Sequence, residues 1–181
     1  NIMIVAPADN FETREAVRAA AQLPKPVYLR FGKKPMPHLP RLELGFELGK
    51  ASLIREGSDL SFLACGETVA RAFAAAELLT KESIQCRVLS LHTIKPLDQA
   101  AVRKAATETR AVITVEEHSV NGGLGEACAG FLIQEGIHTR FKIVGFPDEH
   151  TVTGSQEEIF QHYGIDGPGL ATTARQLLGR S

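Results

Sequence analysis

The sequence contains no tryptophan and only three cysteines, which stand far apart at Cys65, Cys86 and Cys128. An odd number of widely spaced cysteines fits neither a disulfide framework nor a zinc site built from paired cysteines. We therefore interpret these residues as small hydrophobic side chains buried in a reducing compartment. The cytoplasm is accordingly the predicted location.

The chain also lacks an excess of charge of either sign. Its 20 basic and 21 acidic side chains leave a formal net charge of -1, so no overall field attracts a polyanion such as DNA. The basic run from Arg30 to Lys34 contains a single aromatic residue, Phe31, whereas stacking on nucleic-acid bases needs several. We predict no nucleic-acid partner.

No apolar stretch approaches the roughly 20 residues of a membrane-spanning helix, so we predict no membrane contact. Hydrophobic residues at 44% and charged residues at 23% are typical of folded globular proteins. The chain begins at Asn1 and opens directly on the apolar run Ile2–Val5, without the features of a signal peptide. We therefore expect that sequence upstream of Asn1 is missing.

Residues 1–34 show a strand, helix, strand pattern. Apolar runs predict strands at Ile2–Ala6 and Val27–Arg30. Asp9, with Glu12 three positions later, resembles a capping box for a helix from Asn10 to about Gln22. Such a unit is too small to bury a core by itself, so we interpret it as the remnant of a larger domain.

Residues 35–49 begin with three prolines, at Pro35, Pro37 and Pro40. Proline removes backbone donors and blocks regular helix, so this stretch is predicted to be a linker. A second domain is predicted over residues 50–181.

Apolar runs alternate with helical patterns throughout that second domain. This alternation is typical of a parallel sheet with helices on both faces. Ala51–Ile54 is the exception, because the turn at Arg55–Ser58 is too short for a crossover and makes the strand antiparallel. The predicted fold class is α/β, a three-layer αβα arrangement with a five-stranded, mostly parallel sheet containing one antiparallel strand. Its predicted strands are Ala51–Ile54, Leu60–Cys65, Cys86–Leu91, Val112–Val115 and Phe141–Val144, and its helices lie near Val69–Thr80, Gln99–Thr109, Leu124–Glu135, Gln156–Tyr163 and Leu170–Leu178.

A Gly-rich segment, Glu116–Glu126, follows one of these strands and opens a helix. Free backbone N–H groups at such a helix start hold anions, but the pattern is neither a dinucleotide fingerprint nor a phosphate loop. Close packing of helix on strand, with a tight turn, is the favoured explanation of the glycines. His118, in the same segment, is likewise interpreted as a hydrogen-bonding group at an interface in preference to a catalytic residue.

A cationic pair, Arg30 and Lys33, stands at and just beyond the end of the Val27–Arg30 strand. A guanidinium offers a two-pronged donor suited to a phosphate ester, and an ammonium adds a point charge. Surface ion pairing is the alternative. The scattered histidines His138, His150 and His162 share no helical i, i+4 spacing, and we assign no metal to them.

Four segments, taken together and in this order, resemble the C-terminal half of transketolase-like enzymes. These segments are Pro7–Glu12, Pro26–Arg30, Val88–Asp98 and Thr114–Gly125. The resemblance is nearest to the C-terminal subunit of transketolases split over two chains. 1-Deoxy-D-xylulose-5-phosphate synthase and the beta subunits of 2-oxo acid dehydrogenases are more distant relatives.

The resemblance implies an enzyme that transfers a two-carbon ketol unit between sugar phosphates with thiamine diphosphate and magnesium. Residues 1–34 resemble the end of the pyrimidine-binding domain, and residues 50–181 resemble the C-terminal domain. The family's motif for binding the diphosphate and the metal, Gly-Asp-Gly followed by an asparagine, is absent from this sequence. The stretch of the family's pyrimidine-binding domain that contains the glutamate assisting ylid formation on the cofactor is absent as well. We therefore expect the cofactor to be bound mainly outside this chain, and the chain to be inactive alone.

The implied partners are a sugar phosphate and an upstream domain or N-terminal subunit, in a homodimer or heterotetramer. Two other functions stay open, a 1-deoxy-D-xylulose-5-phosphate synthase-like enzyme and a non-catalytic assembly or regulatory domain. We carry over one functional role from the family, the cation that grips the sugar phosphate, which either Arg30 or Lys33 matches.

The family's strand order would place Leu60–Cys65 between its neighbours and reverse the crossover direction beside Val112–Val115. A crevice at these strand ends is a hypothetical secondary site for an anion or regulator. Its predicted lining is Gly66, Glu67, Thr68, His118, Gly122 and Gly123.

Overall fold

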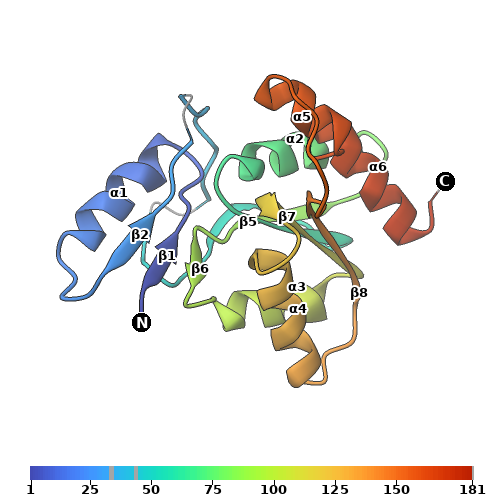
Figure 1. Ribbon diagram of the computed structural model, residues 1–181. Helices are drawn as coiled ribbons and strands as arrows, with labels where there is room; N and C mark the ends of the chain where they lie inside the picture. The colour runs from blue at the N-terminus through green and yellow to red at the C-terminus, as the bar shows by residue number, and fades with distance from the viewer. Residues whose placement is uncertain (33–34, 43–44, 181) are drawn as a thin grey trace.

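The computed structural model describes residues 1–32, 35–42 and 45–180, and two β-sheets organise them (Figure 1). The larger sheet has the order β3-β5-β4-β7-β8. Its only antiparallel pair is β3 with β5, among the strands described. The predicted five-stranded, mostly parallel sheet is therefore confirmed. The strands are β3 (Ser52–Arg55), β4 (Leu60–Ala64), β5 (Cys86–Ser90), β7 (Ala111–Ser119) and β8 (Arg140–Phe146).

The antiparallel strand has a different neighbour from the one that the short turn suggested. β4 is flanked on both sides by parallel partners, β5 and β7, so no edge of β4 is left for β3. Between β3 and β4 the chain instead passes over the start of β5. β3 therefore pairs with β5, on the edge of β5 that faces away from β4. Gly57 makes this crossing compatible with the backbone of Cys86, because a Cβ at that position would collide with it.

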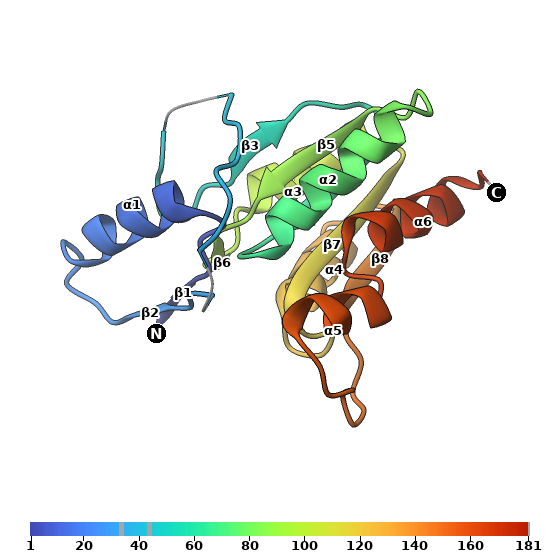
Figure 2. The same ribbon diagram turned by 90° about the horizontal axis from the view of Figure 1, so that it is seen from above.

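Helices cover both faces of the large sheet, as expected for αβα layering (Figures 1 and 2). α2 (Thr68–Thr80), α5 (Gln156–His162) and α6 (Gly167–Leu178) contribute to one hydrophobic core, and α3 (Gln99–Glu108) and α4 (Leu124–Gln134) contribute to the other. Every residue of β4 and β5 is buried, which explains why these strands are rich in apolar residues. No helix among the described residues is long and apolar enough to span a membrane.

The smaller sheet joins the first segment of the chain to the second. It has the order β2-β1-β6, from β1 (Met3–Val5), β2 (Val27–Leu29) and β6 (Thr93–Lys95). The strand β6 was not predicted, because three residues ending at a proline carry little periodicity. Helix α1 (Asn10–Ala20) packs beside this sheet (Figure 2). The division into 1–34, 35–49 and 50–181 stays a prediction.

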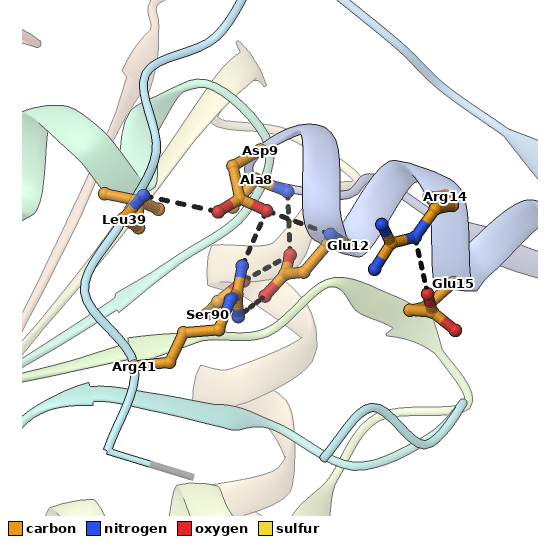
Figure 3. A network of polar contacts seen from close by, with 8 residues as sticks. All are labelled: Ala8, Asp9, Glu12, Arg14, Glu15, Leu39, Arg41 and Ser90. Carbon is orange, nitrogen blue, oxygen red and sulfur yellow. Dashed lines mark hydrogen bonds and ion pairs between the residues drawn. The ribbon is translucent and has the colours of Figure 1, made fainter. Parts of the chain in front are cut away.

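A buried ionic network fastens α1 to the linker and to the large sheet (Figure 3). Arg41 pairs with Asp9 at 2.6 Å and with Glu12 at 3.1 Å, and all three side chains are buried. The hydroxyl of Ser90 donates to Glu12 at 3.0 Å. The backbone N–H of Leu39 donates to Asp9 at 3.3 Å, so the network joins three segments of the chain.

The two carboxylates also cap α1, although not as a full capping box. Asp9 accepts from the N–H of Glu12 at 2.9 Å, as predicted, but Glu12 accepts from the N–H of Ala8 at 2.7 Å instead of reaching Asp9. Burial raises the pKa of Glu12. Burial also acts to raise the pKa of Asp9, but the hydrogen bonds from Arg41 and the helix amide outweigh it and lower that pKa.

Replacing Arg41 with Met should destabilise the protein by about 3–5 kcal/mol at pH 8, because two buried carboxylates lose their counter-ion. Without the guanidinium the folded-state pKa values of both carboxylates rise above those of the unfolded chain. The free energy of unfolding of the variant is then highest below the unfolded-state pKa values and falls as the pH increases through the folded-state values. The deficit should therefore shrink at pH 5. Urea unfolding followed by circular dichroism measures both quantities.

Arg14→Met is the matched control, since Arg14, like Arg41, lies over the Phe11 ring but is 57% exposed and pairs only with Glu15 among the residues that the structure describes. It should change stability by about 0.5 kcal/mol or less. Equal losses in the two variants would contradict the importance of the buried network.

His92 supplies a second, pH-dependent contribution to the joint between the sheets. Its ring is fully buried, stacks on Phe46 at 4.3 Å between centroids, and its Nε2 has no partner among the described residues. Burial, together with the charge of Arg41, lowers the pKa of His92 to about 4. Its main-chain carbonyl accepts from the N–H of Ala6 at 2.7 Å.

Because the pKa of His92 is depressed in the folded state, its contribution is complete above the unfolded pKa of 6.5 and is lost as the pH falls toward 4. The full loss amounts to about 3 kcal/mol. His92→Phe, which keeps an aromatic ring on Phe46, should lose less stability than the original protein between pH 6.5 and 4. Identical pH profiles in urea unfolding would refute this role.

Candidate functional site

Two adjoining cavities lie where β4 and β7 end. The connections from β4 to β5 and from β5 to β7 run in opposite directions along the sheet, so this is the predicted point at which the crossover direction changes. The cavities have volumes of about 440 Å³ and about 220 Å³. Both are lined by Arg30 and Glu117.

Arg30 follows the last residue of β2, and its N–H donates to Val5 at 2.8 Å. Its guanidinium turns toward the end of β7. Nη2 donates to the main-chain oxygen of Glu117 at 2.9 Å, and Nη1 donates to the carboxylate of the same residue at 3.3 Å. The side chain of Arg30 remains 38% exposed. Lys33, the other predicted cation, lies outside the described residues.

Glu67 and Gln156 continue the polar lining of the larger cavity. Nε2 of Gln156 donates to Glu117 at 2.9 Å and to Glu67 at 2.6 Å. Oε1 of Glu67 is buried and has no partner among the described residues. The remaining wall is largely aromatic and aliphatic, from Phe31, Phe146, Ile159 and Phe160 among others.

The smaller cavity brings together three predicted residues, His118, Gly122 and Gly123. His118 is exposed, and its Nδ1 lies 2.8 Å from the main-chain oxygen of Ser119. Gly122 has φ of +76°, a conformation that favours glycine. Its N–H donates to Glu126 at 2.7 Å.

Glu116 already occupies the start of α4. This carboxylate is 1% exposed and accepts from the N–H groups of Leu124 at 2.7 Å and Gly125 at 2.8 Å. A protein carboxylate thus takes the place that an anion would need. These contacts do not favour the expected anion site, which stays a prediction.

Gly66 and Thr68 lie beside the cavities but do not line them. The hydroxyl of Thr68 is buried within hydrogen-bonding reach of the main-chain oxygens of Cys65 and Val115, 2.8 Å from each. The N–H of Gly66 donates to Ala6 at 2.9 Å. Both residues therefore help to hold β4, α2 and β1 together.

The cysteines are buried and free, which agrees with their interpretation as small core residues. Cys65 lines the smaller cavity, but burial raises the pKa of its thiol to about 12. Burial raises the pKa of Cys86 to about 12 and that of Cys128 as well. A thiol that holds its proton at neutral pH is a poor nucleophile.

Sequence reasoning missed Gln156 and the specific roles of Glu116 and Glu117. The pair Glu116–Glu117 stood within the Gly-rich segment already singled out, and its position at a strand end was the available signal. Gln156 carried none, because it reaches the site from α5, far along the chain. Within residues 1–32, 35–42 and 45–180, no group of three or more His, Cys, Asp or Glu side chains has the geometry of a metal site.

Residues 49–170 match the sequence model of the family described as "Transketolase, C-terminal domain". The chain is 43% identical over 176 residues to one of the subunits of the apulose-4-phosphate transketolase of Phocaeicola vulgatus, covering 97% of this chain and 56% of that protein. It is 34% identical over 178 residues to 1-deoxy-D-xylulose-5-phosphate synthase of Heliobacterium modesticaldum, covering 97% of this chain and 28% of that protein.

Among solved structures, a split-gene transketolase described as an inactive beta4 tetramer superposes with a TM-score of 0.87 at 33% identity. The superposition covers 99% of this chain and 57% of that one. The chain therefore spans about half the length of the first of these relatives and of the solved split transketolase.

The glycines of α4 offer a test of the packing interpretation. A Cβ at Gly125 would collide with Ile143 and Thr114, whereas a Cβ at Gly130, in the same helix, would meet nothing within 4 Å. Gly125→Ala should cost about 1–3 kcal/mol through overpacking. Gly130→Ala should stabilise the protein by about 0.5–1 kcal/mol through the better helix propensity of alanine. Urea unfolding distinguishes them, and a harmless Gly125→Ala would contradict close packing.

Proposed function

The chain belongs to the transketolase family through its C-terminal domain, and we propose that it is the C-terminal part of an enzyme that transfers a two-carbon ketol unit between sugar phosphates. The observation that carries the proposal is the similarity over 97% of this chain to a transketolase subunit that is itself a separate polypeptide. The whole enzyme would lie in the cytoplasm.

Arg30 is the residue of this chain that we propose to bind the substrate phosphate, with Lys33 as the alternative. Its guanidinium borders both cavities and is partly exposed. Charge-assisted hydrogen bonds from a guanidinium suit the geometry of a phosphate ester. The alternative interpretation of Arg30, as a partner in a surface ion pair, also has support, since its guanidinium pairs with Glu117.

Thiamine diphosphate and magnesium are the proposed cofactors, and the residues present here do not fit their site. The Gly-Asp-Gly motif is absent from the sequence, and the part of the chain that the structure describes holds no cluster of metal-ligating side chains. When bound, thiamine diphosphate supplies the electron sink for ketol transfer. We therefore propose that an upstream domain or N-terminal subunit provides the cofactor site.

The small sheet supports the need for such a partner. β2 pairs only with β1 among the described residues, which leaves its other edge open. Ile2 is 41% exposed and Tyr28 is 53% exposed, although the sheet's other face is packed under α1. Open strand edges and exposed apolar side chains are typical of surfaces that pair with further polypeptide. A homodimer or heterotetramer is the proposed assembly.

A second activity has its own support. The similarity to 1-deoxy-D-xylulose-5-phosphate synthase covers 97% of this chain at 34% identity. Co-expression with the upstream polypeptide should therefore be followed by assays for ketol transfer between sugar phosphates and for 1-deoxy-D-xylulose 5-phosphate formation. An assembled complex that loads thiamine diphosphate but catalyses neither reaction would favour a non-catalytic assembly or regulatory domain.

In the assembled enzyme, Arg30→Ala should raise KM for a phosphorylated sugar about tenfold or more, because a charge-assisted hydrogen bond is lost. KM for the corresponding unphosphorylated sugar should be unchanged. Steady-state kinetics with both sugars, repeated for Lys33→Ala, measures the effect. Arg110→Ala, an exposed arginine near the opposite end of β7, is the control. Unchanged phosphate preference in both Arg30→Ala and Lys33→Ala would refute the proposed role.

A further inference from the structure

We propose that Glu117 is a positioning residue that orients the guanidinium of Arg30 for the substrate phosphate, and that Gln156 holds Glu117 in turn. The inference rests on the proposed function, since it concerns the same phosphate site. It assigns the C-terminal domain a specific part in substrate binding, through side chains from β7 and α5.

The guanidinium of Arg30 is held at two of its nitrogens. Two different nitrogens donate to two different oxygens of Glu117, one in the main chain and one in the carboxylate. Two bonds from separate nitrogens fix the plane of a guanidinium as well as its position. Of its five N–H groups, the other three have no partner among the described residues and are left for a phosphate.

Glu117 is itself held by a second partner. One carboxylate oxygen, Oε2, accepts from Arg30, and the other, Oε1, accepts from Gln156 at 2.9 Å. The side chain of Glu117 is 18% exposed. With both oxygens engaged, the carboxylate loses the freedom to rotate away from Arg30.

Gln156 lies on a well-anchored helix, α5. It is the first residue of α5, whose start is closed by a capping box between Ser155 and Glu158. α5 is anchored by Phe160, which is 1% exposed and packs against Phe146 with ring centroids 6.1 Å apart. The second bond from Gln156, to Glu67 at 2.6 Å, ties the amide to the residue that precedes α2 as well.

Contacts therefore connect the hydrophobic core to Arg30, through α5, Gln156 and Glu117. β2 ends at Leu29, and the open edge of its sheet leaves Arg30 without support from a neighbouring strand on that side, among the residues described. Glu117 and Gln156 supply that support from the large sheet and α5. A preorganised cation binds a phosphate without the cost of ordering a long side chain.

The test uses the enzyme assembled with its upstream polypeptide and compares phosphorylated with unphosphorylated sugars. Glu117→Ala should raise KM for the phosphorylated sugar about tenfold and Gln156→Ala about threefold, which is the range for one lost hydrogen bond. kcat and KM for the unphosphorylated sugar should stay unchanged. Glu117→Gln keeps an acceptor for Arg30 and should restore most of the loss. Glu77→Ala, an exposed glutamate of α2, is the matched control.

A double variant separates positioning from an independent effect. If Glu117 acts through Arg30, adding Glu117→Ala to Arg30→Ala should raise KM no further. Additive losses, or equal losses with both sugars, would overturn the inference. A change in phosphate preference in Arg30→Ala without one in Glu117→Ala would also overturn it while leaving the proposed function intact. Unchanged preference in Arg30→Ala would remove Arg30 from the phosphate site and would overturn the inference with it.

A binding measurement keeps the inference testable without turnover. Calorimetric titration of the assembly with sorbitol 6-phosphate, and with sorbitol as the unphosphorylated comparison, should show about tenfold weaker binding of the phosphate in Glu117→Ala. Equal affinity for sorbitol 6-phosphate in Glu117→Ala and the original assembly, with weaker binding in Arg30→Ala, would contradict the positioning role.

Discussion

The neutralisation of two buried carboxylates by Arg41 is the interaction on which the rest of this structure depends. Asp9 and Glu12 lie at the start of α1, and Arg41 comes from the segment that leads into the large sheet. Ser90, at the end of β5, closes the network from the other side. Two carboxylates this close cannot remain buried and charged without a counter-ion, so the segment around Arg41 must follow one path over the molecule. That path holds the small sheet against the large one.

The candidate site follows from this arrangement. Arg30 emerges from β2, which pairs with β1, and β1 is bonded to the end of β4 through Ala6 and Gly66. The carboxyl ends of β4 and β7 are therefore brought next to a cation from a segment that precedes both in sequence. Neither sheet contains the cavities alone, because their linings include residues from both. A shift of the small sheet would move Arg30 away from Glu117.

The sequence predicts the large sheet well and the details of the site poorly, for identifiable reasons. β4 and β5 are buried on both faces, so their apolar residues marked them as strands, and Asp9 is the N-cap of α1 as local spacing suggested. Strand pairing was harder: β3 pairs with β5, because the position of β4 between two neighbours is a property of the whole sheet. The contact between Gln156 and Glu117 joins residues 39 positions apart, and no local pattern reports such a distance.

The Gly-rich turn shows how one motif supports two interpretations until its contacts are known. A strand followed by glycines and a helix start is the setting of many anion sites. Here Glu116 supplies the negative charge from within the chain, and a side chain at Gly123 would collide with that same carboxylate. The turn is therefore used to bury an acidic group, while the next residue, Glu117, points to Arg30. Adjacent glutamates at the end of one strand thus have different partners: Glu116 accepts from the first amides of α4, and Glu117 accepts from Arg30. The alternation of side chains along a strand makes this division natural, and it places the domain's contact with Arg30 on β7.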